Sequence, residues 1–229
     1  MTKFSKAEMS KASKTLRKAL KEGKGYLKEI TMKDTNGKTH KISKAQYMGL
    51  FESQNIFIMK QPDNRYPNYV TLNNTSSNPL VLNYQNDKYS CCVASFNMCV
   101  QMLFDWIPES KIKKIFKTNT NGTNPSNMVV GAKALGYTAT QIARNYSAVK
   151  KSLQKGFPVL IHYETGGKTK PKCMGFINNY GHFMMIYGIT SDGYYLCADP
   201  TNGLRKCKPS EIDKATNGRD IHYYSIGIL

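Results

Sequence analysis

Two stretches in the first third of the chain carry apolar residues at the spacing of an amphipathic helix. Each follows a serine, Ser5 or Ser43, and each serine has a Glu or Gln three residues later, which is the pattern of a capping box. The pattern predicts one helix from about residue 6 and another from about residue 44. The residues expected on their apolar faces are Ala12, Leu16, Ala19 and Leu20 in the first and Met48, Phe51, Ile56, Ile58 and Met59 in the second.

The two stretches are copies of one degenerate repeat. Their capping serines lie 38 positions apart, and a short extended segment follows each predicted helix, at residues 26–32 and 66–72. Asn36-Gly37, between the copies, is a turn signal. The polar segment 73–79 is rich in loop-forming residues and indicates a domain boundary. We therefore predict a small, mainly helical repeat domain over residues 1–75 and a second domain over residues 80–229.

The second domain has helical patterns first and strand patterns after them, which is typical of an α+β fold. The expected helices cover residues 91–104, 109–116, 124–136 and 147–155, and the expected strands cover residues 157–163, 182–190, 194–198 and 221–228.

Charge narrows the range of partners. The chain has 33 Lys and Arg against 15 Asp and Glu, a formal net charge of +18, and half of this excess lies within residues 1–75. Such a field attracts nucleic acid, anionic membrane surfaces or anionic wall polymers. No apolar segment follows the first basic residues, so no secretory signal is predicted, and the longest apolar run, Phe183–Ile189, is too short to span a bilayer. We expect a monomer that is made in the cytoplasm and does not bind a membrane.

Six cysteines lie at positions 91, 92, 99, 173, 197 and 207. Their spacing does not match a zinc site, and we expect them to be thiols in a reducing cytoplasm. Whether Cys173 or Cys197 pairs with Cys207 is left open by the sequence. No pattern requires a cofactor, and dependence on a divalent cation is an open alternative.

Four residues form a candidate catalytic set. Cys91 opens a predicted helix, where the backbone N–H groups and the helix dipole favour a thiolate. His182 begins one predicted strand, and Asp199 ends the next, so a tight turn between the strands would bring them together. This arrangement supplies a nucleophile, a base and an acid that orients the imidazole. Gln85, just upstream of the helix, is placed to help the Cys91 N–H hold an oxyanion.

This order of residues resembles papain-like cysteine peptidases, and in particular those that process double-glycine leader peptides. Cys91-Cys92-Val93-Ala94-Ser95 stands where that branch has Cys-Gly-Pro-Ala-Ser, and Gly181-His182-Phe183 and Asp199-Pro200 follow in the family order. The resemblance covers about residues 83–229 and implies a papain-like α+β domain with Cys91, His182, Asp199 and Gln85 at its active site. Because Cys92 replaces the family glycine, Cys92 is the alternative nucleophile.

A second resemblance concerns the end of the repeat domain. The segment 64–72, Asn-Arg-Tyr-Pro-Asn-Tyr-Val-Thr-Leu, is similar to the signature of the pseudomurein-binding repeat. Together with the first resemblance it implies a pseudomurein endoisopeptidase of the viruses and proviruses of methanogenic archaea. Such an enzyme cleaves the bond between Ala and the ε-amino group of Lys in the wall and is released by lysis. The residues implied in wall binding are Arg65, Tyr66, Pro67, Asn68 and Tyr69.

Each of these residues also has a purely structural interpretation. A cysteine at the start of a helix is more often a buried thiol than a nucleophile, and a histidine in a strand is often part of the core. Packing explains Tyr66, Pro67 and Tyr69 as well as wall contact does. Three functions therefore remain open: a wall endoisopeptidase, an intracellular or leader-peptide cysteine peptidase with a basic partner-binding domain, and a catalytically silent binding protein. The third lacks any motif that reads nucleic acid bases.

Overall fold

The fold is described from a computed structural model for residues 1–164, 181–215 and 221–229. The chain forms two compact units. The first comprises Met1–Val81 together with Val100–Trp106, and the second comprises Leu82–Cys99 and Ile107–Leu229. The sequence pattern did not indicate that residues 100–106 belong with the first unit. Cys173 lies outside the described residues.

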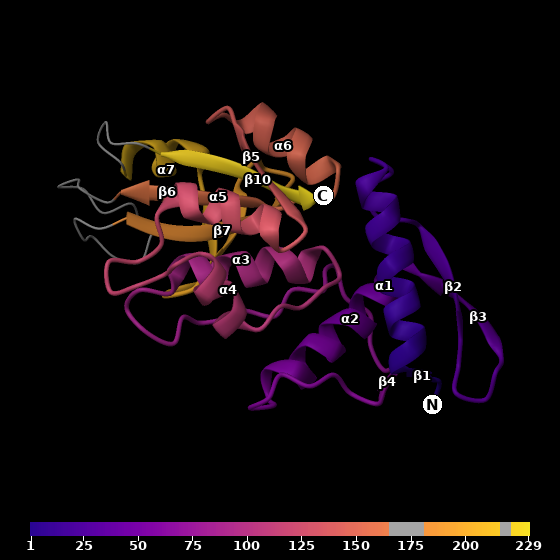
Figure 1. Cartoon of the computed structure of the whole chain (residues 1–229). Coiled ribbons are helices and arrows are strands. Elements are labelled where there is room, and N and C mark those ends of the chain that lie inside the picture. The colour runs from indigo at the N-terminus through magenta and orange to yellow at the C-terminus, as the bar shows by residue number, and fades with distance from the viewer. Residues whose placement is uncertain (165–180, 216–220) are drawn as a thin grey trace. The chain divides into compact units, whose positions relative to one another are not determined.

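The first unit contains the predicted repeat, with a strand, a helix and a strand in each copy (Figure 1). The outer strands pair with each other, β1 with β4, and the inner strands form the hairpin β2–β3, both antiparallel. The two copies are thus joined at both ends of the repeat. The elements are β1 (Lys3–Ser5), α1 (Lys6–Lys21), β2 (Glu29–Lys33), β3 (Thr39–Ser43), α2 (Lys44–Met59) and β4 (Tyr69–Thr71).

Serine caps begin both helices, as predicted. At α2 the capping box is complete, because Ser43 accepts from the Gln46 N–H and Gln46 accepts from the Ser43 N–H. At α1 the box is only half made. Ser5 accepts from the N–H of Glu8, but the Glu8 carboxylate instead accepts from the backbone of Lys33 in β2, at 2.8 Å. The prediction of a reciprocal box at α1 was therefore wrong, because a tertiary contact takes the glutamate.

Most of the predicted apolar faces are buried. All four predicted residues of α1 are at most 5% exposed, and Met48, Phe51 and Ile58 of α2 are at most 1% exposed. Ile56 is 39% exposed, so its assignment to the buried face was wrong. The turn at Asn36-Gly37 is confirmed as the tip of the β2–β3 hairpin, where Gly37 has a φ of 82° that favours glycine.

A six-stranded antiparallel sheet forms the second unit, with the strand order β5-β10-β6-β7-β8-β9. The helices α6 and α7 pack on one face, where Val149 and Ile212 join a core with Ile161, Met184 and Ile186. The helix α3 lies on the other face (Figure 1). The strands are β5 (Tyr137–Ile142), β6 (Val159–Glu164), β7 (Gly181–Ile189), β8 (Tyr195–Asp199), β9 (Gly203–Cys207) and β10 (His222–Ile228), and the helices are α3 (Cys91–Met102), α4 (Glu109–Ile115), α5 (Pro125–Ala134), α6 (Tyr146–Gln154) and α7 (Pro209–Ala215).

The helix α3 is buried along its whole length, since every residue from Cys91 to Met102 is classed as buried. A helix that is covered on all sides carries apolar residues all round, and its sequence therefore shows no single apolar face. The sequence predicted one apolar face, formed by Ala94, Met98 and Met102. These residues are buried, but the rest of the helix is buried as well. The Ser95 hydroxyl donates to the backbone carbonyl of Phe183 at 3.0 Å and so ties α3 to β7.

The predicted helices and strands of this unit are confirmed to within a few residues, whereas β5, β9 and α7 were not predicted. Among the described residues, none of the helices has both the length and the apolar character that a membrane span requires.

Candidate active site

Three elements bring the candidate catalytic residues together. Cys91 is the first residue of α3, His182 is the second residue of β7, and Asp199 is the last residue of β8. The strands β7 and β8 are antiparallel neighbours, so the beginning of one lies beside the end of the other. This is the arrangement that the sequence predicted for His182 and Asp199.

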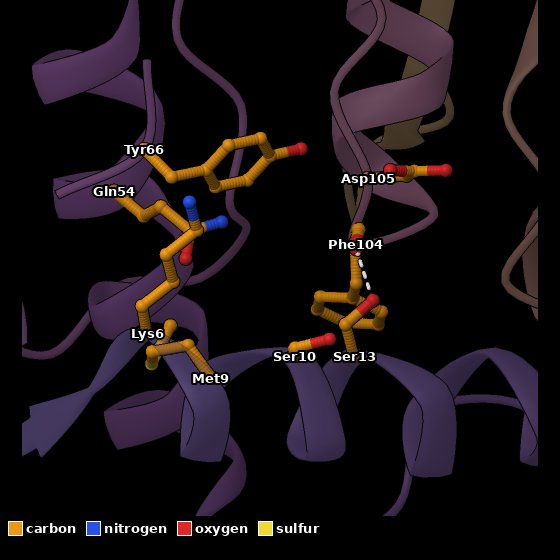
Figure 2. A pocket seen from close by; sticks show the side chains of 8 residues that line it. All are labelled: Lys6, Met9, Ser10, Ser13, Gln54, Tyr66, Phe104 and Asp105. Atoms are coloured by element: carbon orange, nitrogen blue, oxygen red, sulfur yellow. Dashed lines mark hydrogen bonds between the residues drawn. The ribbon is translucent and has the colours of Figure 1, made fainter. Parts of the chain in front are cut away.

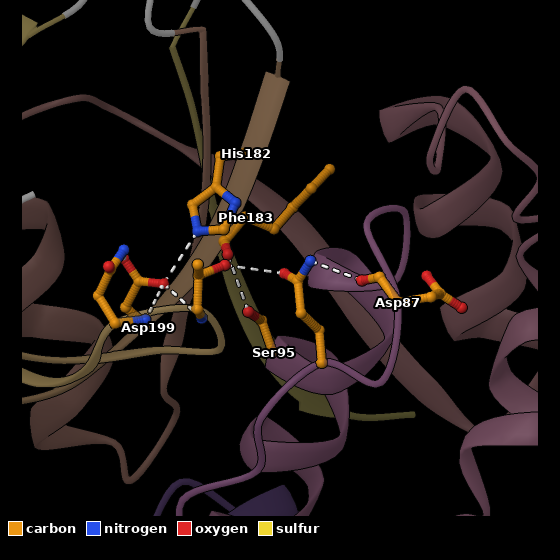
Figure 3. Close-up of polar contacts among 8 residues, drawn as sticks. Asp87, Ser95, His182, Phe183 and Asp199 are labelled. Atoms are coloured by element: carbon orange, nitrogen blue, oxygen red, sulfur yellow. Dashed lines mark hydrogen bonds and ion pairs between the residues drawn. The ribbon is translucent and has the colours of Figure 1, made fainter. Parts of the chain in front are cut away.

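The imidazole of His182 lies between the carboxylate and the thiol. Its Nε2 is 3.0 Å from Oδ1 of Asp199 (Figure 3). The ring also hydrogen-bonds to Cys91. Because Nε2 contacts the Asp199 carboxylate, Nδ1 is the ring nitrogen that is available to the Cys91 sulfur. Burial disfavours a charged ring, but the hydrogen bonds to Asp199 and Cys91 outweigh it and raise the pKa of His182 to about 9. The site therefore favours the imidazolium form over most of the physiological pH range.

Asp199 is held by the turn that follows it. Its Oδ1 accepts from the backbone N–H of Thr201 at 2.8 Å and of Asn202 at 3.2 Å, and its Oδ2 accepts from the Asn202 side chain. The carboxylate is fully buried. Burial opposes its ionisation, but His182 and these donors together lower the pKa of Asp199 below its ordinary value. Thr201 and Asn202 were missed at the sequence level, although a polar pair directly after Asp-Pro is the signal of such a turn.

A network of side chains fixes the loop that leads into α3. The Asp87 carboxylate accepts from the N–H of Tyr89 and the hydroxyl of Ser90, both at 2.8 Å, and forms an ion pair with Lys113. Although burial opposes ionisation, these contacts lower the pKa of Asp87 to about 2. Ser90 in turn accepts the Ala94 N–H through its backbone carbonyl, which is the first helical bond of α3. The position of the Cys91 sulfur thus depends on Asp87.

Gln85 is oriented from two sides. Its Nε2 donates to the Asp87 carbonyl at 2.7 Å, and its Oε1 accepts from the hydroxyl of Thr201 at 3.0 Å. An amide nitrogen carries two hydrogens, so one N–H remains for a further acceptor. Figure 3 shows this chain of contacts, which runs between the loop of Asp87 and the turn after Asp199.

The two adjacent cysteines lie in different surroundings. Cys91 is 7% exposed and contacts His182, whereas Cys92 is fully buried. Burial, and then the proximity of Cys91, raise the pKa of Cys92 well above its ordinary value. All the described cysteines, including Cys197 and Cys207, are free thiols, so the possible Cys197–Cys207 disulfide is not formed.

The five residues implied in wall binding lie in the first unit: four of them lie between α2 and β4, and Tyr69 is the first residue of β4. Arg65, Asn68 and Tyr69 are exposed, with Tyr69 at 50%, and Tyr66 is partly buried. Pro67 is buried and packs within the unit. Of the remaining histidines, His162 is a buried residue of β6 and His40 forms an ion pair with Asp34 at 2.8 Å.

Comparison with known proteins places the site in a family. The model of the Peptidase C39 family matches residues 79–218. A curated relative, the mesentericin-Y105 transport/processing ATP-binding protein MesD of Leuconostoc mesenteroides, is 29% identical over 125 residues. That alignment covers 54% of this chain and only 15% of the relative, so the chain spans a small part of the relative's length.

Two solved structures are also similar. The peptidase domain of Streptococcus ComA is 18% identical, with 65% of this chain and 98% of that chain covered at a TM-score of 0.48. A double glycine motif protease from an AMS/PCAT transporter, solved in complex with the leader peptide, is 21% identical, with 66% and 92% covered at a TM-score of 0.48.

The family match covers more than half of the chain and includes Gln85, Cys91, His182 and Asp199. The part of the chain from residue 79 onward thus has the α+β fold of a papain-like cysteine peptidase domain, and the chain belongs to the Peptidase C39 family.

Proposed function

We propose that this chain is a cysteine peptidase in which Cys91 is the nucleophile, His182 the general acid and base, and Asp199 the residue that orients His182. The observation that carries the proposal is the buried contact of the His182 ring with both Cys91 and Asp199. A positively charged imidazole beside the sulfur favours the thiolate, which is the reactive form of cysteine. The backbone N–H groups at the start of α3 act in the same direction.

The reaction would proceed through an acyl-enzyme. The Cys91 sulfur attacks the carbonyl carbon, and the electron pair of the C=O bond moves to the oxygen, which the free N–H of Gln85 and a backbone N–H stabilise. When the intermediate collapses, the C–N bond breaks and the leaving amine takes the proton of His182. Neutral His182 then removes a proton from water, the resulting hydroxide attacks the acyl carbon, and the free acid leaves. The thiolate and imidazolium are restored.

The alkaline limit of activity should depend on Asp199. The pKa of His182 is raised to about 9, so its imidazolium form exists below this pH and is lost as the pH rises through it. Asp199→Asn removes the charge that supports the imidazolium, so we expect the alkaline limb of kcat/KM to move down toward the ordinary histidine pKa of 6.5. A charged hydrogen bond is worth about 1.5–3 kcal/mol, so kcat should also fall about tenfold to a hundredfold. The pH–rate profile is the measurement.

Asp192→Asn is the matched control for this change. Asp192 lies in the same sheet, at the β7–β8 turn, and pairs with the exposed Lys206 at 2.9 Å, away from Cys91. Its profile should coincide with that of the wild type. An alkaline limb that stays at pH 9 in Asp199→Asn would show that Asp199 does not support the charge of His182.

Two substrate classes each have an observation in their favour. The comparisons favour the first, a peptide substrate of the leader-peptide kind, because the curated relative is a transport/processing protein and its 125-residue match covers 54% of this chain. In this case the basic first unit would bind an acidic partner.

The first unit favours the second class, the Ala–ε-Lys isopeptide bond of pseudomurein. Residues 1–78 lie outside the family match and form two copies of a strand–helix–strand repeat, the second of which contains the pattern Arg65–Tyr69. Three of these five residues are exposed, so they are open to a polymer in solution. The net positive charge of the unit suits an anionic wall.

Hydrolysis of two substrates by the full chain separates these classes. The first is a preparation of pseudomurein sacculi, in which new free ε-amines are counted, and the second is a synthetic leader peptide that ends in two glycines. We expect wild-type protein to hydrolyse one of them and Cys91→Ala to hydrolyse neither. Release of ε-amines identifies the wall enzyme, and cleavage after the glycines identifies the processing enzyme. If the wild type leaves both substrates intact, the peptidase proposal is wrong.

A further inference from the structure

The first unit contains a cavity of about 190 Å³ that is lined by α1, α2, the loop after α2 and the segment after α3 (Figure 2). Several of its polar groups have partners within the unit. Ser13 donates to the carbonyl of Phe104 at 2.7 Å. The hydroxyl of Tyr66 donates to the carbonyl of Trp106 at 3.4 Å. These groups indicate no ligand, whereas a carboxylate of the second unit is tied to the candidate active site.

This carboxylate holds the segment that carries Gln85. Glu109 is the first residue of α4 and is partly buried. Its Oε1 accepts from the Nδ2 of Asn83 at 2.5 Å, and its Oε2 accepts from the Nδ2 of Asn86 at 3.2 Å. The two amides stand on either side of Gln85 in the chain. One side chain of another helix thus contacts this segment at two points.

The helix α4 contacts the same loop at a third point. Lys113 lies four residues after Glu109, so the two side chains lie on one face of the helix, and Lys113 pairs with Asp87. On the other side, the backbone N–H of Gln85 donates to the carbonyl of Pro200 at 2.9 Å. The position of Gln85 is therefore set by α4 and by the turn that contains Pro200.

The contact with Glu109 also relates the segment to α3, the helix that begins at Cys91. The Nδ2 of Asn83 donates to the Oδ1 of Asn97, and its backbone N–H donates to the sulfur of Met98, both at 3.4 Å. An amide hydrogen bond to oxygen usually measures about 2.7–3.2 Å, so the bond to Asn97 is a weak one. The charged acceptor on Glu109 is the stronger restraint on the Asn83 amide.

The surroundings of Glu109 disfavour its charge. Burial raises the pKa of Glu109, and the hydrogen bonds from Asn83 and Asn86 offset this effect only in part. Lys113 lowers the pKa further, whereas Asp87 raises it. A neutral glutamine at this position would form hydrogen bonds without the cost of a buried charge. Carboxyl groups with such shifted pKa values gather at functional sites.

We propose that Glu109 is a positioning residue of the candidate active site, whose carboxylate holds residues 83–86 so that the free N–H of the Gln85 amide faces the oxyanion. This role rests on the proposed function, because an oxyanion forms only when Cys91 attacks a carbonyl. Glu109 would act through Gln85 and not on the reacting atoms. Its loss would leave the contact of Cys91 with His182 in place and impair the stabilisation of the transition state.

Kinetics in two backgrounds test this role on whichever of the two substrates the wild type hydrolyses. Glu109→Ala should lower kcat about tenfold and leave KM within about twofold, because the oxyanion contact forms mainly in the transition state. In a Gln85→Ala background the same change should alter kcat by less than about twofold, since the amide that Glu109 orients is absent. An equal loss of kcat in both backgrounds would overturn the inference.

Glu109→Gln is the conservative variant, which keeps the length of the side chain and one acceptor oxygen. It should fold like the wild type and lose only about threefold in kcat, with no further loss in the Gln85→Ala background. This variant decides the question if Glu109→Ala does not fold. A loss of kcat in Glu109→Gln that persists in the Gln85→Ala background would contradict the role.

Glu211→Ala is the matched control. Glu211 also lies in the first turn of a seven-residue helix, α7, and its Oε2 accepts from the backbone N–H of Lys208 at 3.1 Å. The change removes the same charge from the beginning of a helix in the same unit. We expect its kcat to equal that of the wild type. If kcat falls equally in Glu211→Ala and Glu109→Ala, the effect is one of helix stability and the inference is wrong.

The NMR signals of the Gln85 side-chain amide provide a readout that needs no turnover. Glu109→Ala should shift these signals and speed the exchange of their protons with water, whereas Glu211→Ala should leave them unchanged. Unchanged Gln85 signals in Glu109→Ala would overturn the inference even if kcat fell. If the wild type hydrolyses neither substrate, the peptidase proposal fails, and the signals alone decide whether Glu109 positions Gln85.

Discussion

Replacement of Cys91 by alanine should abolish hydrolysis of whichever substrate the wild type accepts, with a loss of at least about 10⁴ in kcat. The side chain supplies the bond-forming atom, and no neighbouring group can take its place, because the acyl-enzyme requires a sulfur within reach of the His182 ring. Single-turnover hydrolysis is the direct measurement. The far-ultraviolet circular dichroism spectrum should be unchanged, because Cys91 lies at the beginning of α3 and is not in its interior.

Cys92→Ala is the matched control, since it removes the same sulfur atom one residue further along the helix. Cys92 is fully buried, and its raised pKa keeps it protonated, so it is a poor nucleophile. We expect the variant to retain kcat within a few-fold and to lose on the order of 1 kcal/mol of stability from the small cavity. If Cys92→Ala were as inactive as Cys91→Ala while still folded, the assignment of the nucleophile would have to be exchanged.

The parts of this fold that local sequence determines were predictable. A serine followed by Gln46 specifies the start of α2, and Asn124 before Pro125 specifies the start of α5, because each cap is completed by residues within one helical turn. The facing ends of β7 and β8 were predictable for a similar reason. A tight turn joins the strands, and the turn alone determines which ends meet.

The edge strands were not predictable in the same way. Strands β5 and β9 stand at the two ends of the sheet order, where only one side of each strand is paired. Edge strands carry polar and charged residues that protect them from aggregation, so they lack the apolar run by which a central strand is identified. Strand β9, with Arg205 and Lys206, is an example. The exposure of Ile56 has a related cause, because burial is decided by the neighbours of a helix as well as by its own pattern.

The candidate site, too, was predictable only in part. The four residues were identified in sequence because they occur in a family order, but the contacts that orient them join distant segments. The bond from Thr201 to Gln85 spans 116 positions, and the pair of Asp87 with Lys113 spans 26. No periodicity or spacing encodes such contacts.

Conversion of Gln85 to glutamate should lower kcat about a hundredfold to a thousandfold, the range found when one oxyanion donor is removed. Glutamate keeps the length of the side chain and can still accept the hydroxyl proton of Thr201, but it has no N–H to offer the oxyanion or the Asp87 carbonyl. Its negative charge would also repel the oxygen that becomes negative in the transition state. Because this contact forms mainly in the transition state, KM should change little.

The control for Gln85→Glu is Gln141→Glu, which introduces the same charge at an exposed position on the edge strand β5. Its kcat should equal that of the wild type. Thr201→Val provides an intermediate case: it keeps the backbone N–H that binds Asp199 but removes the hydroxyl that orients Gln85. A neutral hydrogen bond is worth about 1 kcal/mol, so the loss in kcat should be roughly fivefold. A rise in KM with kcat unchanged in Gln85→Glu would assign Gln85 to substrate binding and leave the oxyanion to backbone groups alone.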